Sequence, residues 1–507
     1  CNVYQWQYAE NCFCRAYRWN HAQHIRHYAT LKDRNKMKKT ILVASILSTA
    51  FSFNSAQAMQ ALNDDQLSHV QGQALLNLMT ATDQSQGLNF YKLSVDALME
   101  LNANIKTLQL GCGGVNNAIG NKAGCDIDIS NIALSGLNKS HDSTGSPEFN
   151  GERAGTSAQI TNPFIEFAIS GNSASTREVV GFRLGAEEIL GLLTLGTDNV
   201  QNPNDGIKSF SGYMKMAQTQ GHSFTEQATF GMTDDEIISG RLKALGQTRQ
   251  FDSKPFTNGV RTEGHTGITV PSMKVDFTMP ETVVTGQRMT AAKVSGIRSS
   301  IPSIPLAVAE PGKSLPGSVQ GTPDFSQDQL YVEFPALLFG SLGTHSFFKM
   351  AAGSSLDELN MDITFVQALN MIHNIPLNGT GGYLSLQSKP VHWQGADQGD
   401  VAQQGWWMSF KEPIQLGYLA TTDKVDISAV LPQVAEAISD YLLYKSEPID
   451  VGFFAALGSL AGIPVEKKLN INVGQYTTQN PATITLTDKV LQNQNVTPNC
   501  YGGMKFC

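Results

Sequence analysis

The clearest pattern in the chain is an alternation of apolar and polar residues between positions 93 and 107. The apolar positions are Leu93, Val95, Ala97, Met99, Leu101, Ala103 and Ile105. Only Leu98 interrupts the polar side, and a period of two over this length predicts a long β-strand with one buried face. Because the stretch exceeds the usual ~3–10 residues of a globular strand, we expect an elongated or curled sheet.

Shorter strand-like segments follow along most of the chain, as in residues 272–279 and 482–488. Spacers rich in Gly, Ser, Thr and Asn separate them, and those at 136–160 and 251–268 predict surface loops. The pattern therefore predicts a mainly β protein. We expect elongated antiparallel sheets, either a curled sheet or a sandwich, with a few short helices.

Three segments have patterns other than that of a strand. Residues 426–444 predict a helix, because their apolar positions recur at helical spacing. These positions are Ile427, Val430, Leu431, Val434, Ile438 and Leu442. A second short helix is expected around Glu187 and Glu188, with both carboxylates facing solvent. The apolar run 451–465 is too short to cross a bilayer and predicts buried core.

Five prolines fall within residues 301–325. Proline lacks the N–H that a central strand donates, so this stretch predicts a linker rather than a strand. We therefore expect an N-terminal β-rich domain over 59–300 and a C-terminal β-rich domain over 326–507, the latter containing the predicted helix.

An export signal is predicted at residues 37–58. Lys38 and Lys39 precede an uncharged apolar run, and Ala56 and Ala58 place the cleavage site before Met59. The apolar run is shorter than the ~20 residues that span a bilayer, which favours a cleaved signal over a membrane anchor. Residues 1–36 differ in composition from the rest and predict an upstream-translated or non-native extension, with the biological start at Met37. The mature chain is thus expected to be exported and not membrane-spanning.

The mature chain is acidic, with 28 lysines and arginines against 42 aspartates and glutamates. A formal charge of −14 argues against a nucleic-acid partner, because such partners require a basic surface. Four cysteines remain after cleavage: Cys112, Cys125, Cys500 and Cys507. An even number in an exported chain predicts disulfides. Three connectivities are possible, of which 112–125 and 500–507 close the shortest loops.

Motifs of common enzyme families are absent from the sequence. It contains no G-x-S-x-G elbow, H-E-x-x-H motif, P-loop or dinucleotide fingerprint, so we predict no catalytic residues, no cofactor and no enzymatic activity. The cysteines and histidines do not show the spacing of a metal site. Residues 198–206 are rich in oxygen ligands but do not match a calcium loop, and their residue types are also those of turns.

All three tryptophans of the mature chain, Trp393, Trp406 and Trp407, fall within seventeen residues rich in glycine and glutamine. Flat aromatic rings beside amides and carboxylates suit a ligand surface, for example one that binds sugars. Tryptophan is also common in strands, where it packs in the core or against a neighbouring strand. Both interpretations are open from the sequence.

Several phrases occur together in the first half of the mature chain. They include MQALNDDQLSHVQGQALLNL from residue 59, the segment between Cys112 and Cys125, and REVVGFRLGAEEILGLL from residue 177. In these the chain resembles exported proteins of Fil-type pilus systems. The resemblance implies association with a surface fibre, with other pilus-system proteins or a surface receptor as partners, and it carries no catalytic residues.

The chain departs from well-understood pilins in two respects. It lacks the leader of type IV prepilins, and its C-terminal residues NCYGGMKFC are not an alternating apolar strand. We therefore expect an exported structural or adhesive protein with an accessory or tip role, in the periplasm, at the outer-membrane surface or in the pilus. The alternative is a periplasmic binding protein that holds an apolar ligand or lipid in a curled β-sheet.

Overall fold

The computed structural model describes residues 76–117, 124–137, 156–254, 267–306, 329–333, 345–351, 353–460, 465–497 and 499. The described residues all belong to one compact unit. The predicted export signal and its cleavage site lie outside the described residues, as do Cys500 and Cys507. The second disulfide therefore stays a prediction.

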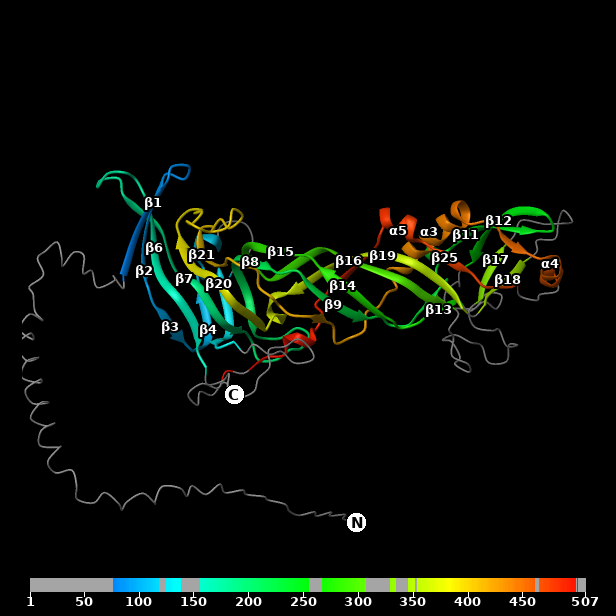
Figure 1. Cartoon of the computed structure of the whole chain (residues 1–507), viewed down its shortest axis with the longest axis horizontal. Coiled ribbons are helices and arrows are strands. Elements are labelled where there is room, and N and C mark those ends of the chain that lie inside the picture. The colour runs from blue at the N-terminus through cyan, green and yellow to red at the C-terminus, as the bar shows by residue number, and fades with distance from the viewer. Residues whose placement is uncertain are drawn as a thin grey trace, which may run out of the picture. The chain divides into compact units, whose positions relative to one another are not determined.

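The described residues form mainly β-structure, as predicted, and their strands pair into four sheets (Figure 1). The largest sheet contains β1 (Leu76–Asp83), β2 (Leu88–Val95), β3 (Leu98–Leu101), β4 (Ala103–Leu110), β5 (Ile127–Ser135), β6 (Ala158–Ser170), β7 (Glu178–Thr194), β8 (Gly206–Met216), β15 (Thr282–Met289), β20 (Asn374–Gln387) and β21 (Gly405–Phe410). The second sheet contains β9 (Thr219–Phe224), β14 (Lys274–Met279), β16 (Ala291–Leu306), β19 (Ser354–Ala368), β22 (Leu419–Ala420), β25 (Asn470–Asn472) and β26 (Ala482–Thr487).

Two smaller sheets and a few short helices complete the described part. The third sheet contains β11 (Ser239–Ala244), β12 (Gln247–Lys254), β17 (Gln329–Glu333), β18 (His345–Met350), β23 (Ile449–Val451) and β24 (Val465–Lys467), and the fourth pairs β10 (Ala228–Phe230) with β13 (Ile268–Val270). The α-helices are α3 (Leu431–Asp440), α4 (Phe453–Leu460) and α5 (Gly474–Gln479). Single turns of 3₁₀-helix lie at Val115–Asn117, Asp234–Glu236, Leu369–Met371 and Gln492–Gln494, and a π-helical turn at Tyr441–Lys445 follows α3.

The largest sheet is curled, as expected. Its pairings run from β5 to β7, β20, β21 and β8 and return from β8 to β5, so these five strands form a closed circuit. Most pairs are antiparallel, but β21 and β8 are parallel. Strands β6 and β2 continue the sheet beyond the circuit, and β1 forms its outer edge.

The predicted long strand exists as three consecutive strands, β2, β3 and β4, separated at residues 96–97 and 102. The first two pieces pair with β6 and the third pairs with β5. The predicted burial of its apolar side is wrong. Leu93, Met99, Leu101 and Ile105 are all exposed.

The structure differs from the predicted division into two successive domains. Strands on either side of the proline-rich stretch share sheets: β20 pairs with β7, and β19 pairs with β16. Residues 301–306 belong to β16 although they include Pro302 and Pro305. Among the described residues this half of β16 pairs only with β19, so it lies at a sheet edge there, where proline leaves no ladder hydrogen bond unmade. Residues 307–325 lie outside the described residues.

The helix predicted at 426–444 is confirmed as α3 and the turn after it, and five of its six apolar positions are fully buried. The helix expected around Glu187 and Glu188 is wrong, because both residues lie in the seventeen-residue strand β7. Burial of the run 451–465 is also wrong at its start, since Phe453 and Phe454 are exposed on α4. In the two wrong predictions, sheet pairing at β7 and a surface position on α4 override the local pattern.

Three buried apolar clusters stabilise this architecture. One lies inside the curled sheet and extends onto β14, β16 and β19. A second lies between the second sheet and α3, whose Gln433 is hydrogen-bonded to Thr483 of β26. The third lies on the opposite side of β2, β6 and β7, where residues 388–404 cover the sheet.

Candidate functional site

One face of the curled sheet carries two apolar rows that cross six strands. Residues directly opposite each other on neighbouring strands share a face of the sheet, so the pairing register defines each row. The first row is Leu78, Leu93, Ile165, Leu184, Leu384 and Met408. The second row is Thr80, Tyr91, Phe167, Phe182, Leu386 and Trp406. We call these twelve residues the apolar face.

The apolar face is open to solvent at its outer end. The exposed fraction is 68% at Leu78 on β1, 42% at Leu93, 41% at Ile165 and 44% at Leu184. Leu384 on the next strand is only half-buried, as is Met408 beyond it. Six strands at ~4.8 Å spacing make each row about 24 Å long. No residue of either row is charged, so the face is a contiguous apolar surface of a kind that marks interaction sites.

The opposite face of the same strands is covered. Trp393 packs beside Phe90 of β2 with ring centroids 5.8 Å apart, and Trp407 of β21 is buried in the same cluster. Trp393 and Trp407 are 0% and 1% exposed, so they cannot present their rings to a ligand. Core packing is therefore the interpretation that holds for these two tryptophans, and the alternative of a ligand surface does not apply to them.

Two polar pairs lie on this covered face. Arg183 of β7 contacts Glu166 of β6 at 2.5 Å, and both side chains are almost fully buried. The hydroxyl of Tyr383 donates to the carboxylate of Asp400 at 2.7 Å. Burial and the nearby Asp400 carboxylate raise the pKa of Tyr383 far above its ordinary value. The Arg183–Glu166 pair joins β7 to β6, and the Tyr383–Asp400 hydrogen bond holds residues 388–404 against the sheet.

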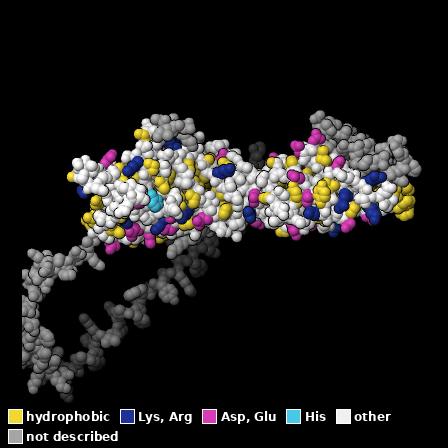
Figure 2. All heavy atoms as spheres, turned by 90° about the horizontal axis from the view of Figure 1, so that it is seen from above, with side chains coloured by type: hydrophobic (Ala, Val, Ile, Leu, Met, Phe, Trp, Pro, Cys, Tyr) yellow, Lys and Arg dark blue, Asp and Glu magenta, His cyan; other side chains and the backbone are white. Residues whose placement is uncertain are grey.

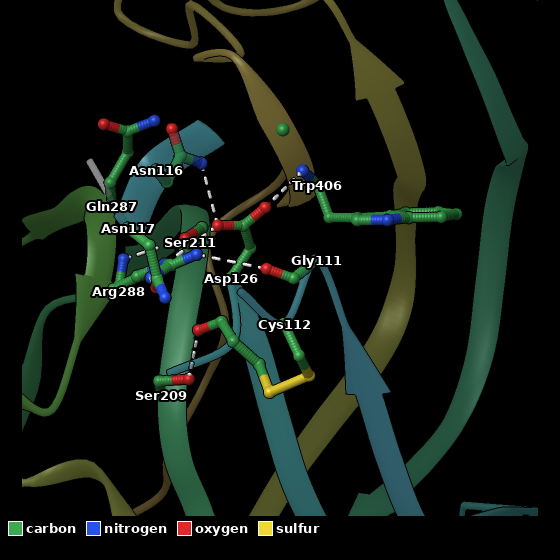
Figure 3. Close-up of polar contacts among 12 residues, drawn as sticks. Gly111, Cys112, Asn116, Asn117, Asp126, Ser209, Ser211, Gln287, Arg288 and Trp406 are labelled. Atoms are coloured by element: carbon green, nitrogen blue, oxygen red, sulfur yellow. Dashed lines mark hydrogen bonds and ion pairs between the residues drawn. A yellow bond between two sulfur atoms is a disulfide. The ribbon is translucent and has the colours of Figure 1, made fainter. Parts of the chain in front are cut away.

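Trp406 closes the inner end of the second row. Its indole lies edge-on to Phe182, with ring centroids 6.1 Å apart and an interplanar angle of 83°. Its backbone N–H donates to Oδ2 of Asp126 at 3.0 Å. Figure 3 shows the indole pointing away from Asp126, so the main chain of Trp406 is held by a polar cluster while its ring joins the apolar face.

The polar cluster behind Trp406 is centred on a buried ion pair. Nε of Arg288 lies 2.9 Å from Oδ1 of Asp126, and their side chains are 4% and 3% exposed. Oδ1 also accepts a hydrogen bond from Nδ2 of Asn116 at 2.8 Å. Arg288 donates further to Oδ1 of Asn117 at 2.7 Å and to the carbonyl oxygen of Gly111 at 3.1 Å (Figure 3). The charges are therefore hydrogen-bonded as well as paired, as buried charges require.

The predicted disulfide between Cys112 and Cys125 is confirmed and forms part of this cluster. It closes the loop that carries Asn116 and Asn117, and the carbonyl of Cys125 accepts a hydrogen bond from Ser209 at 2.7 Å. Sequence reasoning found the disulfide but missed Asp126 and Arg288. They are 162 residues apart in the chain, and no local pattern indicates that they pair.

The calcium alternative for residues 198–206 finds no support in the geometry. Oδ2 of Asp205 accepts hydrogen bonds from Asn131 and Thr197, each at 2.8 Å, so these groups satisfy one another as in a turn. Among the described residues, no group of three or more His, Cys, Asp or Glu side chains is arranged to hold a metal ion. Within the same residues, no helix is long and apolar enough to cross a membrane.

Comparison with known proteins does not assign the chain to a family. No protein-family model matches it, and no curated protein or solved structure is significantly similar to it. The function must therefore be argued from the chain's own surfaces.

Charged side chains are distributed evenly on the surface that Figure 2 shows. Lysines and arginines alternate there with aspartates and glutamates, and the described residues in that view form no continuous basic patch. This agrees with the acidic composition and leaves the apolar face as the most distinctive surface of the curled sheet.

Proposed function

We propose that this chain is an exported, non-enzymatic structural or adhesive protein of a surface pilus system, in an accessory or tip role. It binds a partner protein of that system through the apolar face. The observation that supports this proposal is the pair of uncharged rows, of which the first is exposed over four neighbouring strands. A soluble protein that leaves such a surface open normally buries it against a partner. The export signal and the resemblance to Fil-type proteins supply the cellular setting.

A protein partner is favoured by the edge that adjoins the apolar face. Strand β1 pairs with β2, and among the described residues nothing pairs with its outer side. Its eight residues LNLMTATD contain no proline, lysine or arginine, the residues that usually protect an edge strand. A partner strand can therefore extend the sheet at β1 by main-chain hydrogen bonds and cover the rows with its side chains.

The test is a double substitution on the apolar face, Leu93→Asp with Ile165→Asp. Both side chains are exposed, so the charges should leave the fold intact while opposing burial against a partner. We expect the protein to remain exported but to fall at least about tenfold in the sheared surface fraction. Val283→Asp, at an exposed valine on β15 outside the face, is the matched control and should stay at the wild-type level. Wild-type protein confined to the periplasm would contradict the proposal.

A second candidate function is the binding of an apolar ligand or lipid on the same curled sheet. It is favoured by the fall in exposure along the first row, from Leu78 at the edge to Met408 near the core. A single hydrocarbon chain could lie along this row of the apolar face. Lipid extracted in stoichiometric amount from purified protein, and lost in the Leu93→Asp, Ile165→Asp variant, would support this function over the pilus role.

A further inference from the structure

A polar pocket of about 350 Å³ lies on the covered face of the curled sheet, beside residues 388–404. Strands β2, β6, β7, β20 and β21 supply most of its lining, and residues within 394–400 supply much of the rest. Arg183, Asp400 and Ser409 are buried at its floor, whereas Glu187 and Lys411 are exposed at its rim. The volume lies near the lower end of the ~300–1,000 Å³ that is usual for ligand pockets, so the space suits a small molecule.

The floor of the pocket is held in place by Arg183. Its Cζ atom lies 5.1 Å from the ring centroid of Phe164, 5.0 Å from that of Tyr383 and 5.1 Å from that of Trp393. A guanidinium this close to an aromatic face is attracted to it. Nη2 of Arg183 also donates to the carbonyl oxygen of Gln394 at 2.7 Å, which fixes the neighbouring loop. A site that is ordered before its ligand arrives loses less conformational entropy on binding.

Several polar groups of the lining can form further hydrogen bonds. The hydroxyls of Tyr383 and Ser409 donate to Oδ2 of Asp400 at 2.7 Å and 2.5 Å, so their oxygen atoms can still accept. In the described part of the chain, the side-chain amide of Gln394 has no hydrogen-bond partner. Nζ of Lys411 has only a 3.8 Å contact with the carboxylate of the next residue. The lining therefore offers both donors and acceptors to a ligand.

The charges of the lining largely cancel. The guanidinium of Arg183 is paired with its carboxylate partner on β6, and Nζ of Lys92 lies 2.9 Å from Oε1 of Glu187. The two charges of the lining that remain are those of Lys411 and Asp400, one of each sign. A ligand with a net charge therefore finds no excess of the opposite charge here, and a neutral ligand is favoured.

A ligand that matches this lining is small, neutral and rich in groups that both donate and accept hydrogen bonds. A hydroxyl does both, and a sugar ring carries several hydroxyls around its edge. Phe164, Ala186 and Ala396 supply apolar contacts for the C–H groups of such a ring.

We infer that this pocket binds a neutral monosaccharide, either free or as the terminal residue of a glycan. The inference goes beyond the proposed function, which depends on the apolar face. Because the pocket and the apolar face lie on opposite faces of the same strands, variants of one should leave the other intact.

The experiment uses the full exported chain and, as probes, the methyl glycosides of galactose, glucose, mannose and N-acetylglucosamine. We expect saturable binding of at least one probe in saturation-transfer NMR. Absence of binding by all four would overturn the inference. Tighter binding of the anionic N-acetylneuraminic acid or the cationic glucosamine than of every neutral probe would also overturn it.

A second measurement distinguishes the two sources of the sugar. The chain is applied to immobilised neutral glycans that end in the sugar of the best-bound probe. Binding to these glycans would identify a glycan terminus as the source, whereas binding of the free glycoside alone would identify a free sugar.

A double variant locates the binding site. Gln394→Ala with Lys411→Ala removes the two groups with unused donors and should weaken binding of the best-bound probe at least about tenfold, without a change in melting temperature. Lys411→Ala alone, at an exposed position, serves if the double variant does not fold. Gln220→Ala with Lys293→Ala is the matched control, because it removes the same residue types at exposed positions of the second sheet. Equal binding by the pocket variant and the control would refute the assignment to this pocket.

The apolar-face variant separates this inference from the proposed function. Leu93→Asp with Ile165→Asp should bind the best-bound probe like wild type even where it is lost from the sheared surface fraction. Loss of probe binding in this variant, with full binding in the pocket variant, would assign the sugar to the apolar face and overturn the inference.

Discussion

Asp126 and Arg288 form a buried ion pair that joins the disulfide loop to β15. Nε of Arg288 lies 2.9 Å from Oδ1 of Asp126, while Oδ2 accepts the backbone N–H of Trp406 on β21. One carboxylate thus connects three segments at the inner end of the apolar face. Because the indole of Trp406 closes the second row, the geometry of that face depends on a polar cluster located behind it (Figure 3).

Replacing Asp126 should therefore destabilise the chain strongly. Asp126→Asn removes the negative charge and leaves the guanidinium of Arg288 buried without a counter-ion. Loss of one partner from a buried pair costs about 3–5 kcal/mol in the free energy of unfolding. Urea unfolding, followed by tryptophan fluorescence, measures this loss directly.

The matched control is Asp362→Asn. Oδ1 of Asp362 lies 3.7 Å from Nε of Arg298, whose side chain is 86% exposed. The same substitution therefore breaks an ion pair that water already screens. The free energy of unfolding of Asp362→Asn should fall by no more than about 1 kcal/mol. Equal losses in the two variants would show that the buried pair does not stabilise the fold as argued.

The disulfide should contribute independently of the ion pair. Removing both of its cysteines, as Cys112→Ser with Cys125→Ser, should lower the free energy of unfolding by about 2–4 kcal/mol, because the unfolded chain regains the freedom of a closed loop. The variant Cys500→Ser with Cys507→Ser provides the comparison and also tests the second predicted disulfide. If the cysteine at 112 contributes only as an apolar side chain, adding a reductant to wild-type protein would not change its stability.

Gly405 is required where the chain passes the carboxylate of Asp126. Its φ of 102° is unfavourable for other residues, and a Cβ atom there would overlap Oδ2 of Asp126 and Nδ2 of Asn116. Gly405→Ala should therefore combine backbone strain with displacement of the carboxylate. Gly395→Ala is the matched control, because its φ of 74° imposes similar strain but open space surrounds the new methyl group.

Chemical denaturation should rank these two variants. We expect the free energy of unfolding to fall by about 1–2 kcal/mol in Gly395→Ala, from backbone strain alone, and by more in Gly405→Ala. A change in the near-UV circular dichroism of the tryptophans should accompany only the Gly405 variant, since Asp126 positions Trp406. Similar losses and spectra would mean that the close approach to the carboxylate has no consequence.

Local patterns predicted the local features of this fold. The mainly β architecture, the helix at 426–444 and the Cys112–Cys125 disulfide follow from periodicity and cysteine spacing, and all three are confirmed. The pattern around Glu187 and Glu188 predicts a helix because a strand with bulges mimics helical spacing, and β7 shows register shifts against its partner β20. Local spacing cannot show which neighbour a segment will pair with, and pairing decides its conformation.

The sequence predicted the apolar residues of the candidate site but not their exposure. Alternation identified Leu93 as one member of an apolar side, yet alternation alone cannot say whether that side is covered. Whether it is covered depends on long-range pairing, which brings β20 from residue 374 beside β7 and places Trp406 at the end of a row. Exposure of the alternating side was therefore a property of the assembled sheet, and it is the observation on which the proposed function depends.

His373 should make the stability of the chain depend on pH. The side chain is fully buried, and its Nδ1 lies 2.8 Å from the carbonyl oxygen of Leu195. Burial lowers the pKa of His373 below its ordinary value of 6.5, although the Leu195 carbonyl and the more distant Asp205 and Asp198 oppose the shift. The imidazole is therefore held neutral in the folded chain at a pH where the unfolded chain already binds a proton.

The sign of the effect follows from this difference in proton binding. Below about pH 6.5 the unfolded state binds more protons at this site, so the free energy of unfolding should fall with decreasing pH, by up to about 1.4 kcal/mol per pH unit. His373→Gln has no titrating group, so its stability should decline less than that of wild type between pH 7 and pH 5 in urea titrations. Because all other titrating groups are common to both proteins, the difference between the two curves isolates His373. Parallel curves over this range would show that the buried imidazole does not control the acid sensitivity of the fold.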